Sequence, residues 1–142
     1  MKRISWIFSL LLANFFTQAQ DSWKIKLNTK AILSSNAENE AANTKKVTSS
    51  EFDKKGDLEI LYKEESAKEG WSRSLLFFDE NDNELLRKDS ITTNTRINNT
   101  SLKNLVADKK KLKIYTISLP TDPNMAAAIR VRRVHLCTLE LQ

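Results

Sequence analysis

Three arginines near the C-terminus are the residues whose type and spacing point most directly to binding chemistry. Arg130, Arg132 and Arg133 lie close together, two residues before His135. On a regular strand Arg130 and Arg132 share one face and Arg133 points the other way, although a bulge would gather all three guanidinium groups on one side. Such a cluster suits a carboxylate, sulfate or phosphate, because guanidinium forks bind planar oxyanions through paired hydrogen bonds. The alternative, which we favour, is ion pairing with acidic residues on neighbouring strands.

Trp71 is the second binding candidate. It follows Glu69 and Gly70, precedes Arg73 by two residues, and stands at the entrance to an apolar stretch. An exposed tryptophan in such a place can stack on a sugar ring or on a side chain of a partner. The alternative is that Trp71 covers one end of the core, and most tryptophans at strand entrances do so.

The only histidine and the only cysteine of the chain, His135 and Cys137, lie two residues apart. On a strand this spacing puts both on the same face with backbones about 7 Å apart, which is marginal for a nucleophile and its base. Apolar neighbours such as Leu136 and Leu139 favour a packed strand. We therefore expect a buried cysteine, with no intramolecular disulfide, and no catalytic pair.

Asp79, Asn81 and Asn83 occupy the first three ligand positions of a calcium-loop pattern, but the pattern then fails. Glu84 stands where a glycine is required, and Ser90 stands where a bidentate glutamate belongs. A solvated hairpin turn is the better interpretation. A hydrolase built on Asp79 and Glu84 ranks last, since their spacing gives no reason for a raised pKa. We expect no enzyme activity, metal or cofactor.

These candidates have to be positioned by strands. Glycine and proline are sparse, and short runs rich in β-branched and aromatic residues alternate with polar clusters. That rhythm predicts an all-β fold, an antiparallel β-sandwich of immunoglobulin-like or jelly-roll-like type. The predicted strands are residues 23–27, 31–33, 47–52, 58–62, 71–79, 84–88, 91–97, 112–119 and 129–141.

Two short helical turns complete the prediction. Residues 101–106 have Ser101 as an expected cap, and residues 122–128 begin with aspartate and proline, which favour the cap and the first helical position. Residues 34–46 are rich in Asn, Ser, Ala and Glu and are predicted to be a long loop. The strands at 71–79 and 84–88 form the clearest hairpin, joined by a turn rich in asparagine.

The first 19 residues have the pattern of a secretory signal peptide. Lys2 and Arg3 precede a 13-residue apolar run at 4–16, and Thr17-Gln18-Ala19 follows. The run is short of the roughly 20 residues that a membrane-spanning helix needs. We expect cleavage after Ala19, and one exported domain covering residues 20–142 without a membrane span. The compartment is periplasmic or extracellular.

Charge and composition limit the classes of binding partner that we expect. The chain carries a net charge of +5, which becomes +3 without Lys2 and Arg3, and both signs are interspersed. Nucleic-acid binders concentrate basic charge on one face and interleave aromatic residues, so we do not expect a nucleic-acid partner. An envelope protein or an anionic surface component is the expected partner.

Residues 114–123 and 130–139 resemble small uncharacterised exported proteins of Bacteroidota-type bacteria. The resemblance extends from Trp23 through Trp71 to the end of the chain. It implies a periplasmic or secreted β-rich domain, and it implies no activity and no role for any residue. From the residues we expect a non-enzymatic binding or interaction module of the bacterial envelope. The alternative is a module for an anionic glycan or peptide that uses Trp71 and the arginines.

Overall fold

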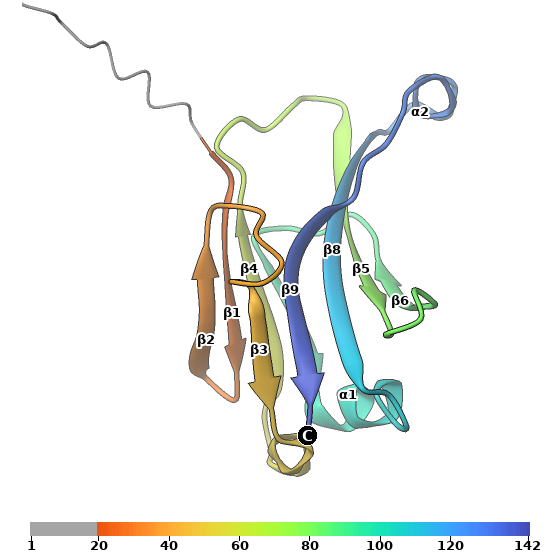
Figure 1. Cartoon of the computed structure of the whole chain (residues 1–142). Helices are drawn as coiled ribbons and strands as arrows, with labels where there is room; N and C mark the ends of the chain where they lie inside the picture. The colour runs from red at the N-terminus through yellow and green to blue at the C-terminus, as the bar shows by residue number, and fades with distance from the viewer. Residues whose placement is uncertain (1–19) are drawn as a thin grey trace, which may run out of the picture.

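A computed structural model describes residues 20–142, and the expected signal peptide at 1–19 lies outside this range. Two β-sheets face each other in the described chain (Figure 1). The strands are β1 (Ser22–Leu27), β2 (Lys30–Ser35), β3 (Thr44–Val47), β4 (Asp57–Lys63), β5 (Trp71–Phe78), β6 (Glu84–Lys88), β7 (Asn94–Asn98), β8 (Lys111–Pro120) and β9 (Val134–Leu141). The short helices are η1 (Ser49–Asp53), α1 (Asn99–Leu105) and α2 (Pro123–Ala128).

The strand order confirms the predicted all-β sandwich class. One sheet has four strands in the order β2-β1-β4-β7, and the other has five in the order β3-β9-β8-β5-β6. All paired strands in these sheets are antiparallel except β3 and β9, which run parallel. The hairpin expected at 71–79 and 84–88 is confirmed as β5 and β6, which pair directly.

Alternation along the strands builds the core between the sheets. Ile25 and Ile60 lie opposite each other in β1 and β4, and both are at most 1 % exposed. The other sheet contributes inward-facing residues such as Phe77 and Ile114, which are fully buried. Because successive side chains of a strand point to opposite faces, one apolar row from each strand suffices to form this layer.

One hydrogen bond joins the two sheets through the core. The indole Nε1 of Trp23 in β1 donates to the main-chain carbonyl of Leu136 in β9 at 2.9 Å. Both residues are buried. A buried tryptophan requires a partner for its N–H, and here that partner lies on the facing sheet.

Two predicted strands were wrong in their extents. The strand expected at 47–52 ends at Val47, and the chain then turns into η1, from which Phe52 places its ring in the core with 3 % exposure. The strand expected at 129–141 begins only at Val134. Pairing of β8 with β9 stops where Thr116 faces Val134, and residues 129–133 belong to no strand.

Smaller differences concern the loop at 34–46 and the segment at 91–97. The loop is shorter than expected because β2 extends to Ser35 and β3 begins at Thr44. The strand expected at 91–97 begins at Asn94. Residues 91–93 instead form a connection at the end of the sandwich, where Tyr62 N donates to the Thr93 carbonyl at 2.9 Å.

Both helical turns are confirmed, with one correction to a cap. Asn98, and not Ser101, caps α1: its side chain accepts a hydrogen bond from the Ser101 N–H at 2.8 Å. Asp122 caps α2 as predicted by accepting from the Asn124 N–H at 2.9 Å, and Pro123 takes the first helical position. In the described part of the chain, no helix has the length and apolar character that crossing a membrane requires.

The bond between the sheets gives a stability prediction. Trp23→Phe removes the indole N–H, leaves the buried Leu136 carbonyl unpaired and opens a small cavity. We expect the free energy of unfolding to fall by about 2–3 kcal/mol, as measured by urea denaturation. The matched control is Trp71→Phe at a half-buried site, for which we expect a loss under about 1 kcal/mol. Equal losses in the two variants would contradict this role of Trp23.

Candidate functional site

The apolar layer between the sheets ends at a charged residue on β5. Trp71 and Arg73 lie in the same inward-facing row as Leu75 and Phe77, by strand alternation. Gly70 precedes this row in the left-handed backbone region, with φ of 74°, and thereby turns the chain from loop 64–70 into β5. This loop crosses the upper end of the sandwich from β4 to β5 in Figure 1.

The guanidinium group of Arg73 is compensated on several sides. Its Nε donates to Glu64, and its Nη1 donates to Thr116 Oγ1 at 3.2 Å. Its Nη2 lies 3.7 Å from a carboxylate oxygen of Asp21. The side chain is only 15 % exposed, so these contacts replace most of the water that a free guanidinium would bind.

Tyr62 connects this charged group to the core. Its ring stacks on Trp23 with ring centroids 6.2 Å apart. The Arg73 guanidinium lies 4.5 Å from the centroid of the Tyr62 ring. Its hydroxyl donates to Asp21 Oδ2 at 2.6 Å. Burial raises the pKa of the Tyr62 hydroxyl, and the hydrogen bond to Asp21 raises it further, so the phenol stays protonated.

Two hollows flank Trp71 at this end of the sandwich, and together they form what we call the upper cleft. The larger, about 410 Å³, is lined by Trp71, Tyr62, Arg73, Ile91 and hydroxyl-bearing residues such as Ser90. The smaller, about 200 Å³, is also lined by Trp71 and Arg73. The Trp71 ring contributes to the lining of both hollows and places an apolar surface beside hydrogen-bonding groups.

The remaining polar groups of the upper cleft include paired charges. Lys68 places its Nζ 4.6 Å from the centroid of the Trp71 ring, in the smaller hollow. Asp21 and Glu64 line that hollow too, and both contact Arg73. The cleft therefore combines the Trp71 ring with hydrogen-bonding groups of both positive and negative charge. This combination suits a polar ligand with an apolar face better than a strongly charged ligand.

The three C-terminal arginines make three different sets of contacts. Arg132 pairs with Glu38 from the loop between β2 and β3. Arg133 lies on the outer face of the five-stranded sheet, with its guanidinium 4.6 Å from the Phe78 ring centroid and 4.4 Å from that of Tyr115. Arg130 is exposed and makes no ion pair with the residues that the structure describes.

These contacts decide how the predicted site residues are arranged. Arg133 also lies 3.6 Å from Asp82, so two of the three arginines pair with acidic residues from other segments. The upper cleft is lined by Trp71 and by Arg73, and none of the three C-terminal arginines lines it. A binding site that combines Trp71 with an arginine therefore centres on Arg73.

His135 and Cys137 are both buried, and they face different environments. A bulge between Ile114 and Tyr115 separates their pairing partners, so that Cys137 lies in the core and His135 lies against Tyr115 on the outer face. Burial raises the pKa of the Cys137 thiol to about 12 and lowers the pKa of His135 below its ordinary value. The strand spacing suggested one shared face, and the bulge removes it.

Asp79 serves the hairpin turn between β5 and β6. Its Oδ1 accepts the N–H groups of Asn81 and Asn83 at 2.8 and 2.9 Å, and its Oδ2 accepts from the Asn83 amide. These hydrogen bonds lower the pKa of the Asp79 carboxyl to about 2. Within residues 20–142, no group of three or more His, Cys, Asp or Glu side chains could hold a metal ion.

Sequence reasoning missed three members of the upper cleft: Tyr62, Asp21 and Glu64. Two signals were available in the chain itself. Arg73 is a charged residue at an inward position of an apolar strand, which demands compensating groups nearby. Asp21 and Glu64 flank β1 and β4 at the ends that antiparallel pairing of Ser22 with Lys63 brings together.

Comparison with known proteins adds no family assignment. No protein-family model and no curated protein matches this chain. Any function assigned to the chain therefore rests on its residues and their geometry.

The compensation of Arg73 gives the second prediction. Arg73→Gln leaves Glu64 and Asp21 without their cation at a site where Arg73 is mostly buried. We expect a loss of about 2–4 kcal/mol in the free energy of unfolding, measured by urea denaturation. Arg96→Gln is the control, since Arg96 pairs with Asp57 and Glu59 but is 60 % exposed, and its loss should stay under about 1 kcal/mol. A loss at Arg73 no larger than at Arg96 would show that the network contributes little.

Proposed function

We propose that this chain is an exported, non-enzymatic binding module of the bacterial envelope, and that its ligand binds in the upper cleft. One observation carries the proposal: Trp71 is half-buried and lines two hollows at the end of the sandwich where the apolar layer meets Arg73. The end of a β-sandwich is where loops and inward-facing side chains meet solvent without disturbing the core. Binding sites in β-folds are commonly built at such mouths.

A saccharide is the ligand class that this cleft favours. Sugar rings present C–H faces that pack on an aromatic ring, and they present hydroxyl groups that both donate and accept hydrogen bonds. Trp71 supplies the platform, and the Ser72 and Ser90 side chains supply hydroxyl partners in the larger hollow. Because the Arg73 charge is already balanced by Glu64 and Asp21, we expect no strong requirement for an anionic sugar.

The contacts of the carboxylates support a binding role over a hydrolytic one. Glu64 accepts a hydrogen bond from Arg73, and Asp21 accepts from the Tyr62 hydroxyl and from the Glu65 N–H. Hydrolysis of a glycosidic bond calls for two carboxyl groups free to act on the substrate, one of them as an acid. Both cleft carboxylates are instead engaged with groups of the chain itself.

Export is supported by the signal-peptide pattern at 1–19, and it is tested directly. When the full chain is expressed in a bacterium with a Sec pathway, we expect the envelope fraction to contain a protein that begins at Gln20, as read by intact mass. Ala19→Arg should block cleavage and leave the precursor, because the cleavage site requires a small residue. A chain that retains Met1 and stays in the cytoplasmic fraction would contradict export.

The ligand site is tested with residues 20–142, which contain both sheets and the whole described core. A glycan array of neutral and acidic oligosaccharides supplies candidate ligands, and isothermal titration calorimetry measures the affinity of each variant. Trp71→Ala should weaken the affinity for an array ligand by about tenfold or more, because the stacking platform is lost.

Two control variants locate the effect. Ser90→Ala alters the rim of the same cleft with an exposed side chain and should weaken binding more modestly. Lys103→Gln alters a separate hollow of about 400 Å³ at the other end of the molecule and should leave binding unchanged. Binding that survives Trp71→Ala, or that weakens equally in Lys103→Gln, would place the ligand elsewhere.

A further inference from the structure

Residues 121–133 leave the sandwich as a projecting segment, which we call the arm. The arm continues upward from β8, passes through α2 and returns to β9, and its α2 end projects beyond both sheets in Figure 1. All its residues are exposed except Ala126, which is half-buried. Arg132 and Arg133 contact the sandwich, but the apolar side chains nearer the tip remain in water, which is unfavourable for stability.

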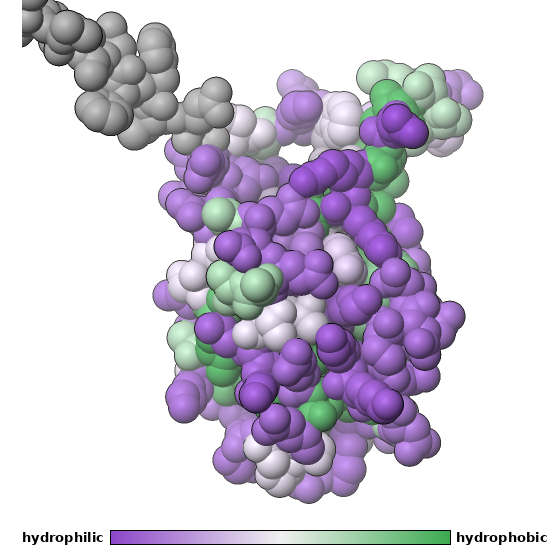
Figure 2. Space-filling model, in the orientation of Figure 1, coloured by the Kyte–Doolittle hydropathy of each residue, from purple (hydrophilic) through white to green (hydrophobic). Residues whose placement is uncertain are grey.

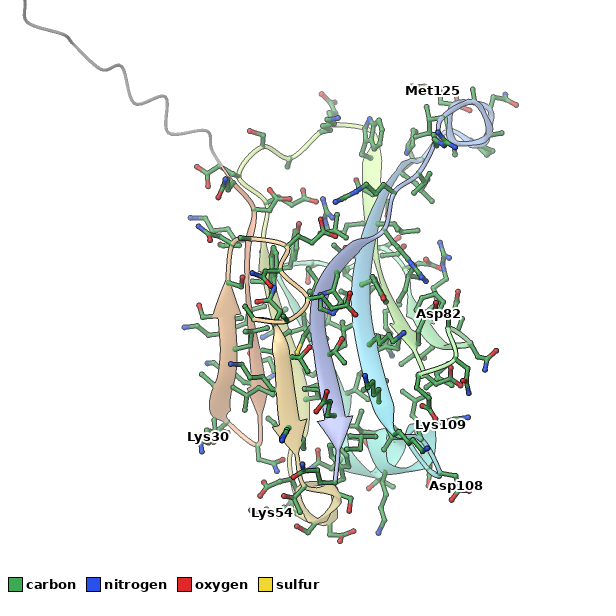
Figure 3. The ribbon with its side chains drawn as sticks, viewed as in Figure 1. Lys30, Lys54, Asp82, Asp108, Lys109 and Met125 are labelled. Atoms are coloured by element: carbon green, nitrogen blue, oxygen red, sulfur yellow. The ribbon has the colours of Figure 1, made fainter. Side chains whose placement is uncertain are left out.

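The arm carries apolar side chains that the rest of the described surface lacks. The large hydrophobic residues that are exposed among residues 20–142 are Met125, Ile129 and Val131, with exposed fractions of 52, 36 and 39 %. All three lie on the arm. Figure 2 shows the hydrophobic colours gathered on this projection, while the body below it is largely hydrophilic, and Figure 3 places Met125 at its tip.

Basic residues alternate with the apolar ones on the returning part of the arm. Ile129, Arg130, Val131 and Arg132 follow one another in exposed, extended chain. Asp122 is the only acidic residue of the arm, and it is occupied in capping α2. In an extended chain, such alternation turns the apolar side chains to one side and the guanidinium groups to the other. A lipid bilayer has the same arrangement, with phosphate groups at its surface and acyl chains beneath them.

The base of the arm is held in place. The Thr121 N–H donates to the Gly70 carbonyl at 2.8 Å where the arm departs. Glu38 holds the returning chain twice, through its pairing with Arg132 and by accepting the His135 N–H at 2.9 Å. The tip is therefore presented in a defined position, and little conformational entropy has to be lost when it meets a surface.

We propose that the arm docks on a lipid bilayer whose surface carries anionic phospholipid headgroups. Met125, Ile129 and Val131 would enter the interface, and Arg130 would contact lipid phosphates. A narrow tip with three separated apolar side chains offers much less contact than the roughly 1,000 Å² that a specific protein interface needs. Insertion into a bilayer requires no such complementary surface. Both the burial of the apolar side chains and the attraction of the basic side chains to anionic lipid favour it.

Vesicle flotation with residues 20–142 tests the proposal. We expect binding to vesicles of phosphatidylcholine mixed with phosphatidylglycerol, and much weaker binding to phosphatidylcholine alone. High salt should weaken binding without abolishing it, because salt screens the arginine contribution but leaves the apolar contribution in place. No binding to the mixed vesicles, or equal binding to both kinds, overturns the proposal and leaves a protein partner as the occupant of the arm.

Variants separate the two contributions. Met125→Ser combined with Ile129→Ser should weaken partitioning about tenfold or more, and Arg130→Gln about fivefold. Lys30→Gln removes the same charge at the opposite end of the sandwich (Figure 3) and should leave partitioning unchanged. All four side chains are exposed, so the melting temperature should not change. Undiminished binding by the Met125 and Ile129 double variant contradicts insertion of the arm.

A site-specific fluorophore gives a second readout. Ala127→Cys at the exposed tip accepts a polarity-sensitive dye, while Cys137 is fully buried and remains unlabelled in the folded protein. We expect the emission to shift to the blue on addition of the mixed vesicles. The same dye on Lys30→Cys should show no shift. A shift at both positions, or at neither, rules out docking through the tip.

Discussion

The architecture depends on how a single apolar layer between two sheets comes to an end. Burying the inward rows of nine strands stabilises the fold, but the layer stops at Arg73, a guanidinium placed between the sheets. An uncompensated charge in such a place would cost several kcal/mol, so the neighbouring groups are arranged around it. Tyr62 offers its ring, Thr116 its hydroxyl, and Glu64 and Asp21 their carboxylates. A continuous chain of contacts thus runs from the core to the surface: Leu136 accepts from Trp23, Trp23 stacks on Tyr62, and Tyr62 contacts Arg73.

The same end of the sandwich carries both proposed interaction surfaces. Trp71 pairs with Pro120, the last residue of β8, directly before the arm departs. The upper cleft and the arm are therefore anchored to neighbouring positions of two paired strands. They differ in character, since the cleft is half-buried and internally neutralised while the arm is exposed, apolar and basic. A rigid β-scaffold that presents a recognition site beside a docking element would hold a ligand close to the surface on which the protein rests.

The arginines show why an alternating pattern is insufficient to define a strand. Residues 129–133 alternate as β9 does, and the sequence therefore predicts one long strand. Alternation records only which faces a chain would present, however, and a strand also needs a partner for its N–H and C=O groups. Beyond the pairing of Thr116 with Val134, residues 117–120 of β8 pair only with β5, and Pro120 has no N–H to donate to a further strand. The segment consequently separates from the sheet, and its arginines take three different environments.

The sequence by itself determined the features that depend on near neighbours along the chain. These are the all-β class, the β5–β6 hairpin, the cap and proline that begin α2, and the burial of Cys137, each of which follows from local periodicity or turn chemistry. Only the tertiary structure decided which distant residues meet. Asp21 and Glu64 reach Arg73 because β1 and β4 pair in one sheet and face β5 in the other. The arm is exposed because no strand or loop covers it within the described chain. Such outcomes depend on strand order and on the pairing of segments far apart in sequence. The local propensity of a segment carries no information about either.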